Sequence, residues 1–155
     1  MAGMRNRFRL WGTLIPLALV AAVTARGAPR SETTVEELKA RVASTSIRDR
    51  PHLCVQIAEK QLAEADKLYA ASEFEKGQAA LTDVVAFSEM ARDYAIQSHK
   101  YQKQTEIATR NMTRKLNDLL HSLSGPDQAP VRDALNRLQR VRDDLLAAMF
   151  PKGAK

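Results

Sequence analysis

The stretch "LYAASEFEKGQAAL", Leu68–Leu81, joins two segments that both have the apolar spacing of an amphipathic helix. It holds no proline and a single glycine, so its composition alone would allow one continuous helix. The phase of the apolar residues argues otherwise, because the inward positions that follow Leu68 fall on the polar Ser72 and Glu75, whereas a new stripe begins at Phe74. This change of phase predicts that the chain reverses over residues 71–75 and that two helices pack against each other.

The segment before this turn is predicted to be a helix from residue 51 to about residue 71. Its apolar side chains recur every three or four residues, and charged side chains take the other face. The apolar set is Leu53, Cys54, Ile57, Ala58, Leu62, Ala65, Leu68 and Tyr69. Pro51 suits a first helical turn, and Asp49 can cap it. Further upstream, Thr34 and Glu37 have the spacing of a capping box, which predicts a short helix to about Ser44.

The segment after the turn contains no proline, and no glycine after Gly77, as far as Leu123. We expect one continuous helix over residues 74–123, with a length of about 75 Å. The apolar positions thin out in "QSHKYQKQTE", residues 97–106, so a bend there is the alternative. A bend would collapse the same elements into a four- or five-helix bundle.

The C-terminal part begins with "SGPDQAP" at residues 124–130, which predicts a loop. A last helix, Val131–Phe150, should pack antiparallel against the apolar strip of residues 108–123. The predicted fold class is therefore all-α, with antiparallel helical hairpins built on one long central helix. The helical domain covers residues 34–150, and a polar tail covers residues 151–155.

One segment carries a resemblance to a known repeat family. The stretch "AEADKLYAASEFEKGQAALTDVVAFSEMA" resembles one helix-turn-helix unit of the tetratricopeptide kind. The matching residues are Ala65, Leu68, Tyr69, Phe74, Ala80 and Leu81. Ser72 and Gly77 depart from the pattern, and no second copy follows at a 34-residue period, so the resemblance implies one degenerate hairpin rather than a stacked binding array. As a whole, the chain resembles exported all-helical proteins of a bacterial type.

The first 25 residues have the features of an export signal. Three arginines within Met1–Arg9 precede the apolar run Leu10–Val23, which is shorter than the roughly 20 residues that span a bilayer. Small residues up to Ala25 predict cleavage after that position, followed by a flexible leader at residues 26–33. The expected location is the periplasm or the exterior, without stable membrane insertion after cleavage. An uncleaved N-terminal membrane anchor is the alternative.

The net charge of the chain is too small to indicate a function in nucleic-acid binding. The formal net charge is +6 over 155 residues, and removal of three leader arginines lowers it to +3. The remaining charge is divided along the chain: residues 51–98 have eight acids and four bases, and residues 99–155 have six acids and eleven bases. Opposite signs at the two ends favour pairing with another copy of the chain.

No pattern in the sequence points to catalysis or to a cofactor. The histidines at positions 52, 99 and 121 lack metal-ligand spacing, and phosphate-binding and nucleophile motifs are absent. The single cysteine, Cys54, lies on the apolar face of its predicted helix, so we expect a small buried residue. The sequence thus predicts a protein that is not an enzyme and that has no metal or cofactor site.

The best candidate for a functional surface is an aromatic ladder. Phe87, Tyr94 and Tyr101 are spaced by seven residues and would share one face of a long helix that is covered only at its two ends. These residues are the predicted partner-binding surface, and the prediction is a helical protein-interaction or scaffold protein that binds a protein partner or itself. A periplasmic chaperone or stress-response protein that binds unfolded clients is the alternative.

Overall fold

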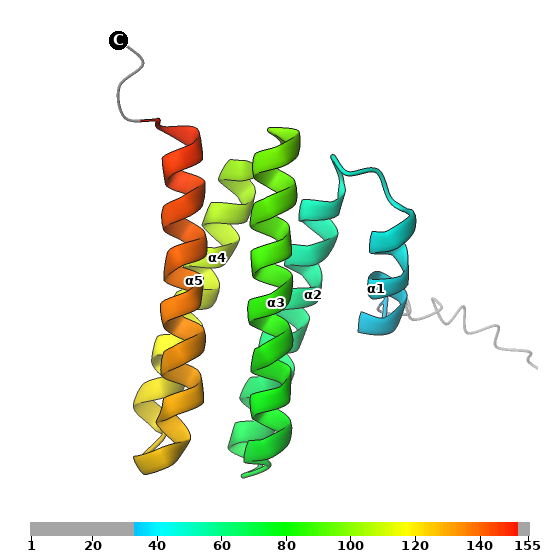
Figure 1. Cartoon of the computed structure of the whole chain (residues 1–155). Coiled ribbons are helices and arrows are strands. Elements are labelled where there is room, and N and C mark those ends of the chain that lie inside the picture. The colour runs from blue at the N-terminus through cyan, green and yellow to red at the C-terminus, as the bar shows by residue number, and fades with distance from the viewer. Residues whose placement is uncertain (1–32, 152–155) are drawn as a thin grey trace, which may run out of the picture. The chain divides into compact units, whose positions relative to one another are not determined.

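The computed structural model describes residues 33–151, and these residues form an all-α bundle without any β-strand. The helices are α1 (Val35–Ser44), α2 (Arg50–Ala70), α3 (Phe74–Ser98), α4 (Gln102–Ser122) and α5 (Gln128–Met149), with a 3₁₀ turn η1 (Gly125–Asp127) before α5. Helices α2 to α5 run alternately up and down, and α1 packs beside α2 (Figure 1). The predicted all-α fold class is confirmed. The predicted signal peptide, its cleavage site and most of the leader and tail lie outside the described residues.

Helix α1 starts where the sequence predicted. Thr34 Oγ1 accepts a hydrogen bond from the amide of Glu37 at 3.2 Å, and the amide of Thr34 donates to Glu37 Oε2 at 3.1 Å. This reciprocal pair is the expected capping box. Leu38 and Val42 are buried, and Lys39 Nζ lies 2.7 Å from Asp83 Oδ2 of α3. The short helix is therefore held by packing and by one ion pair to a distant element.

The reversal between α2 and α3 confirms the predicted elbow. Ser72 adopts a left-handed backbone conformation with φ of 60°. The amide of Ser72 donates to the carbonyl of Tyr69, and the amide of Glu73 donates to the carbonyl of Leu68 at 2.8 Å. These two bonds form a Schellman motif, which satisfies the last carbonyls of α2. By contrast, the predicted capping by Asp49 is wrong, because its carboxylate makes no cap bond and instead accepts from Ser46 Oγ at 2.9 Å.

The preferred prediction of one continuous helix over residues 74–123 is wrong. The chain breaks between Ser98 and Gln102, where His99 and Tyr101 have φ of 54° and 63°. The physical reason is burial: the break lets α4 fold back and bury Met112, Leu116 and Leu119. Helix propensity is a weak preference that such packing outweighs. The bent alternative, a compact bundle, is the one that the structure shows.

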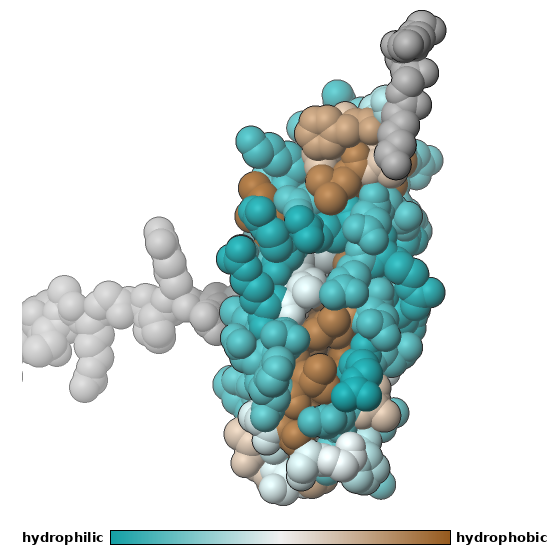
Figure 2. Space-filling model, turned by 90° about the vertical axis from the view of Figure 1, so that its left-hand side faces the viewer, coloured by the Kyte–Doolittle hydropathy of each residue, from teal (hydrophilic) through white to brown (hydrophobic). Residues whose placement is uncertain are grey.

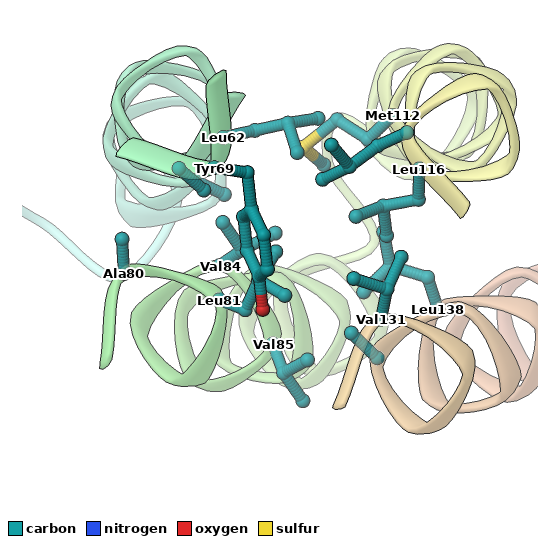
Figure 3. Close-up of a cluster of buried hydrophobic side chains, with 14 residues drawn as sticks. Leu62, Tyr69, Ala80, Leu81, Val84, Val85, Met112, Leu116, Val131 and Leu138 are labelled. Carbon is teal, nitrogen blue, oxygen red and sulfur yellow. The ribbon is translucent and has the colours of Figure 1, made fainter. Parts of the chain in front are cut away.

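The main core lies between two hairpins, α2–α3 and α4–α5. Figure 3 shows labelled side chains from all four helices meeting in the interior between them, with Ala80 and Val85 at its edges. The principal members are Leu62, Tyr69, Leu81, Val84, Val85, Met112, Leu116, Val131 and Leu138. A second cluster joins α1 to α2 and α3 and includes Leu38, Leu53, Cys54, Ile57 and Ala91. The predicted antiparallel pairing of the C-terminal helix with residues 108–123 is confirmed.

The end of the bundle near the break is packed with small and polar residues. Ser88, Thr105 and Thr109 are buried there, and the separate apolar cluster is small, with Ala95, Val141 and Leu145 buried and Ile96 packed against them. Ser88 and Thr109 each donate a hydroxyl hydrogen bond to the carbonyl four residues earlier in their own helix. Small and polar side chains bury less apolar area than leucine, so this end holds the hairpins together less firmly than the elbow end.

Candidate interaction surface

The predicted aromatic residues are half-buried rather than fully available. Phe87 and Tyr94 both pack against the cluster formed with α1 and α2. Each ring also has a cation over it, with Lys39 Nζ 5.4 Å from the Phe87 centroid and Arg50 Cζ 5.2 Å from the Tyr94 centroid. The structure therefore brings these two residues together on one side of α3, where they help to dock α1 and the start of α2.

Tyr101 lies apart from the other two aromatic residues because the helix breaks in front of it. Its ring stacks on the ring of His52, with centroids 6.0 Å apart, and Lys100 Nζ lies 5.4 Å from its centroid. Tyr101 occupies the N-cap position of α4. The seven-residue ladder is thus divided into a pair on α3 and a single ring at the break, and its role in partner binding stays a prediction.

Cys54 is buried, as the sequence predicted. Its side chain is 0% exposed, and burial raises the pKa of the thiol to about 11, although the nearby Arg50 opposes the shift. A thiol with a raised pKa is a poor nucleophile, because the reactive form is the thiolate. Cys54 therefore acts as a small apolar residue of the core.

The three histidines do not converge. His52 contacts Gln56 and Tyr101, the Nδ1 atom of His121 lies 2.6 Å from the carbonyl of Asn117, and His99 is exposed at the break. Within residues 33–151, no three His, Cys, Asp or Glu side chains are grouped closely enough to hold a metal ion. Over the same residues, no helix has the length and apolar character required to cross a bilayer.

A groove between α2 and α4 is the feature that sequence reasoning missed. It encloses about 520 Å³ beside Leu62 and Leu119, which belong to the main core, and the exposed Ala63 lies at its edge. The remaining lining residues are Asp66, Lys67, Lys115, Asp118 and Ser122. The groove thus combines an apolar floor with one acid and one base on each wall. The sequence gives no signal for it, because helical periodicity does not show which two helices of a bundle become neighbours.

A larger hollow of about 830 Å³ lies between α1 and α2. Its lining is mostly polar and includes Glu36, Gln56, Glu59, Gln61 and Glu64. The lining of this hollow is less apolar in proportion than that of the α2–α4 groove, so it is the weaker candidate for a protein-binding surface.

Apolar side chains are also visible on the face formed by α4 and α5. Figure 2 shows a narrow apolar stripe on this face, bordered on both sides by hydrophilic residues. The partly buried Leu120, Leu123 and Leu135 belong to these elements and pack against the main core. At the end of α5, the side chain of Phe150 is 70% exposed. The stripe is a seam between two packed helices, whereas the α2–α4 groove is hollowed.

Comparison with known proteins adds no relative: no family model, curated protein or solved structure matches the chain. The inference about function therefore depends on the surface of the described residues and on the sequence features that predict a leader.

Proposed function

We propose that the protein is exported and that it acts by binding another protein through the groove between α2 and α4. The observation that carries this proposal is the combination of the apolar floor at Leu62 and Leu119 with charged walls of both signs. Grooves of this kind between helices accept the apolar face of an amphipathic helix. The role is that of an interaction or scaffold protein rather than of an enzyme.

The shape and charge of the groove define the chemistry of the partner. The floor would accept two or three apolar side chains at helical spacing, and each buried leucine-sized side chain stabilises a complex by about 1.5–3 kcal/mol. Asp66 and Lys67 on one wall and Lys115 and Asp118 on the other would pair with a partner helix whose flanks carry both acids and bases. So small a contact favours a reversible complex over a permanent one.

The test compares two substitutions at exposed serines that each end a helix. Ser122→Arg places a long cationic side chain at the groove, and Ser44→Arg places the same side chain at the end of α1, away from the groove, as the matched control. Bait protein carrying Ser44→Arg should capture the same partners from the exported fraction as the unmodified protein. Bait carrying Ser122→Arg should lose them. Equal capture by both variants would exclude the groove as the binding site.

Export is tested by the mass of the purified protein. Cleavage after Ala25 gives a mature chain that begins at Arg26, and that mass is the expected result. A chain that keeps residues 1–25 and stays in the membrane fraction would instead support the membrane-anchor alternative.

The chaperone alternative differs from the proposed role because a chaperone binds many unrelated unfolded proteins, whereas an interaction protein binds specific partners. A general client-binding protein needs broad exposed apolar surface, whereas the exposed large apolar side chains of residues 33–151 are the scattered Ile47, Phe74 and Phe150. We therefore expect no suppression of aggregation when the protein is mixed with unrelated unfolded proteins. Strong suppression at equimolar ratio would favour the chaperone role.

A further inference from the structure

The break between α3 and α4 is an unfavourable local conformation. His99 and Tyr101 both lie in the left-handed backbone region, which carries an energetic cost for residues other than glycine. No side chain caps the first amides of α4. From residue 78 to residue 124 the chain contains neither glycine nor proline, so nothing in the local sequence requires the helix to end. A joined helix over residues 74–122 would remove both left-handed residues and satisfy the free backbone groups.

The aromatic ladder points to the same joined helix. Phe87, Tyr94 and Tyr101 are spaced by seven across the break, and only a continuous helix places all three along one line. In the bundle Tyr101 is separated from that line. The sequence pattern thus matches a second conformation that differs from the folded-back one at residues 99–101.

The contacts between the two hairpins must break before α3 and α4 can form one continuous helix, and these contacts are strongest at the elbow end, far from the break. Near the break, the apolar cluster between the hairpins has only three buried members, Ala95, Val141 and Leu145, and Ser88, Thr105 and Thr109 are buried beside it. The Oγ1 atom of Thr105 has no hydrogen-bond partner. Opening can therefore begin at this end, because little apolar area is lost there. At the elbow end the hairpins share a leucine- and valine-rich core, so the α4–α5 hairpin remains stable only if it packs on an equivalent surface.

We propose that two copies of the chain exchange their α4–α5 hairpins and form a domain-swapped dimer with one joined helix, residues 74–122, in each copy. The α4–α5 hairpin of one copy then packs on the α2–α3 hairpin of the other. Every contact between the hairpins is rebuilt between chains, including the pairing of Arg137 with Glu89 and of Arg92 with Asp144. The contacts that change lie at the break, and they include the stacking of Tyr101 on His52 and the pairing of Lys100 with Asp49.

The exchange rests on the break and the hairpin interface, not on the partner of the groove. The groove is rebuilt from α2 of one copy and α4 of the other, so the dimer keeps the surface of the proposed function. Failure of partner capture and failure of exchange are therefore separate results.

The first test compares two double variants that differ from each other only in the backbone preference of the break. The double variant His99→Gly with Tyr101→Gly relaxes the left-handed residues and weakens a joined helix, whereas His99→Ala with Tyr101→Ala does the reverse. Both variants lose the stacking on His52, so they are matched. At equal protein concentration, light scattering after size-exclusion chromatography should show a dimer-to-monomer ratio at least about tenfold higher for the alanine variant. Equal ratios for both variants and the unmodified protein would overturn the proposal.

The second test distinguishes hairpin exchange from side-by-side pairing. Glu89→Arg in one sample and Arg137→Glu in the other each create a like-charge pair within the chain. When the two samples are mixed, a swapped heterodimer restores both pairs, because position 89 of each copy then faces position 137 of the other. Native mass spectrometry should show heterodimers exceeding homodimers by about tenfold, far above random pairing.

The control for this mixing is a single chain that carries both reversals. It restores the pair within the monomer as well as in a dimer, so its circular dichroism and its dimer fraction should match those of the unmodified protein. Random pairing in the mixture, with this control well folded, would overturn the proposal.

Discussion

The ring of Tyr69 lies directly against Gly77, so closely that a Cβ atom on Gly77 would come within 2.8 Å of Tyr69 Cδ2 and Cε2. Gly77 is in the first turns of α3, and Tyr69 is in the last turn of α2, so this contact is where the two helices approach at the elbow. A glycine inside a helix is normally unfavourable by about 0.5–1 kcal/mol relative to alanine. The contact with the tyrosine ring explains why glycine nevertheless occupies this position.

Gly77→Ala should therefore lower the free energy of unfolding, by about 1–3 kcal/mol, because the ring has to shift within a packed core. Urea unfolding followed by circular dichroism measures the change. In a Tyr69→Leu background the same substitution should raise the free energy of unfolding by about 0.5–1 kcal/mol, because only the helix preference of alanine remains. The same sign in both backgrounds would contradict this explanation.

The buried hydroxyl of Thr105 lacks a hydrogen-bond partner, so we expect its removal to stabilise the protein. Its Oγ1 atom is buried and makes no hydrogen bond. Thr105→Val removes the cost of burying that oxygen and should raise the free energy of unfolding by about 1 kcal/mol.

The matched control for Thr105 is Thr109→Val, one turn further along α4. Thr109 Oγ1 donates to the carbonyl of Thr105 at 2.8 Å, so its hydroxyl is satisfied. Thr109→Val should lower the free energy of unfolding or leave it unchanged. Equal stabilisation by both substitutions would show that the missing hydrogen bond is not the cause.

Because the thiol of Cys54 is buried, we expect the free energy of unfolding to depend on pH in the alkaline range. Burial raises the pKa of the folded thiol from 9.0 to about 11, so the folded chain keeps a proton that the unfolded chain releases. The free energy of unfolding should therefore fall as the pH rises from 9 to 11, with a contribution of up to about 2–3 kcal/mol from this group. The full contribution is present below pH 9.

The contribution of Cys54 is obtained by subtracting the free energy of unfolding of a Cys54→Ala variant from that of the unmodified protein. Burial also raises the pKa of Tyr69, with Asp127 as the second cause, so tyrosine ionisation lowers stability in the same direction at alkaline pH. Denaturant unfolding of the unmodified protein and of a Cys54→Ala variant should be compared at each pH. The gap between the two curves should narrow with rising pH, and a constant gap would contradict the prediction.

Glu106 is a buried carboxylate that is paired with Arg142, so we expect removal of Arg142 to lower the free energy of unfolding. Arg142 Nε lies 2.7 Å from Glu106 Oε1, and the side chain of Glu106 is only 9% exposed. Arg142→Met leaves the carboxylate without its partner and should lower the free energy of unfolding by about 1–3 kcal/mol. Adding Glu106→Met should recover most of that loss in thermal unfolding, and an additive loss would show that the pair is not coupled.

Local signals in the sequence predicted most of the helix ends. The capping box at Thr34 and Glu37, the phase change before Phe74 and the glycine at position 125 all mark real boundaries. The last helix begins at Gln128, three residues before the predicted start at Val131, because Pro130 is accommodated in its first turn. These boundaries are set by residues that lie within a few positions of one another. Such signals can be read without knowing the rest of the fold.

The break at residues 99–101 is indicated only weakly, because the thinning of apolar positions over residues 97–106 allows a bend there without requiring one. His99 and Tyr101 do not favour a left-handed backbone, and the conformation is imposed by burial of residues on α4 that lie up to five turns away. The groove is also a property of tertiary packing, because it depends on α2 and α4 being neighbours. Asp49 is a smaller example of the influence of tertiary contacts. The local pattern predicts that its carboxylate caps α2, but the carboxylate instead interacts with Ser46 and Lys100.

If residues 1–25 are removed as proposed, tyrosine fluorescence can report on the two ends of the bundle separately. Tyr69 lies at the elbow end, while Tyr94 and Tyr101 lie toward the break, and the single tryptophan, Trp11, belongs to the predicted leader. After cleavage, ultraviolet fluorescence would therefore come from tyrosine alone. Replacing Tyr69 with phenylalanine would restrict the emission to the two rings near the break, so that motion at this end of the bundle could be followed without an attached dye.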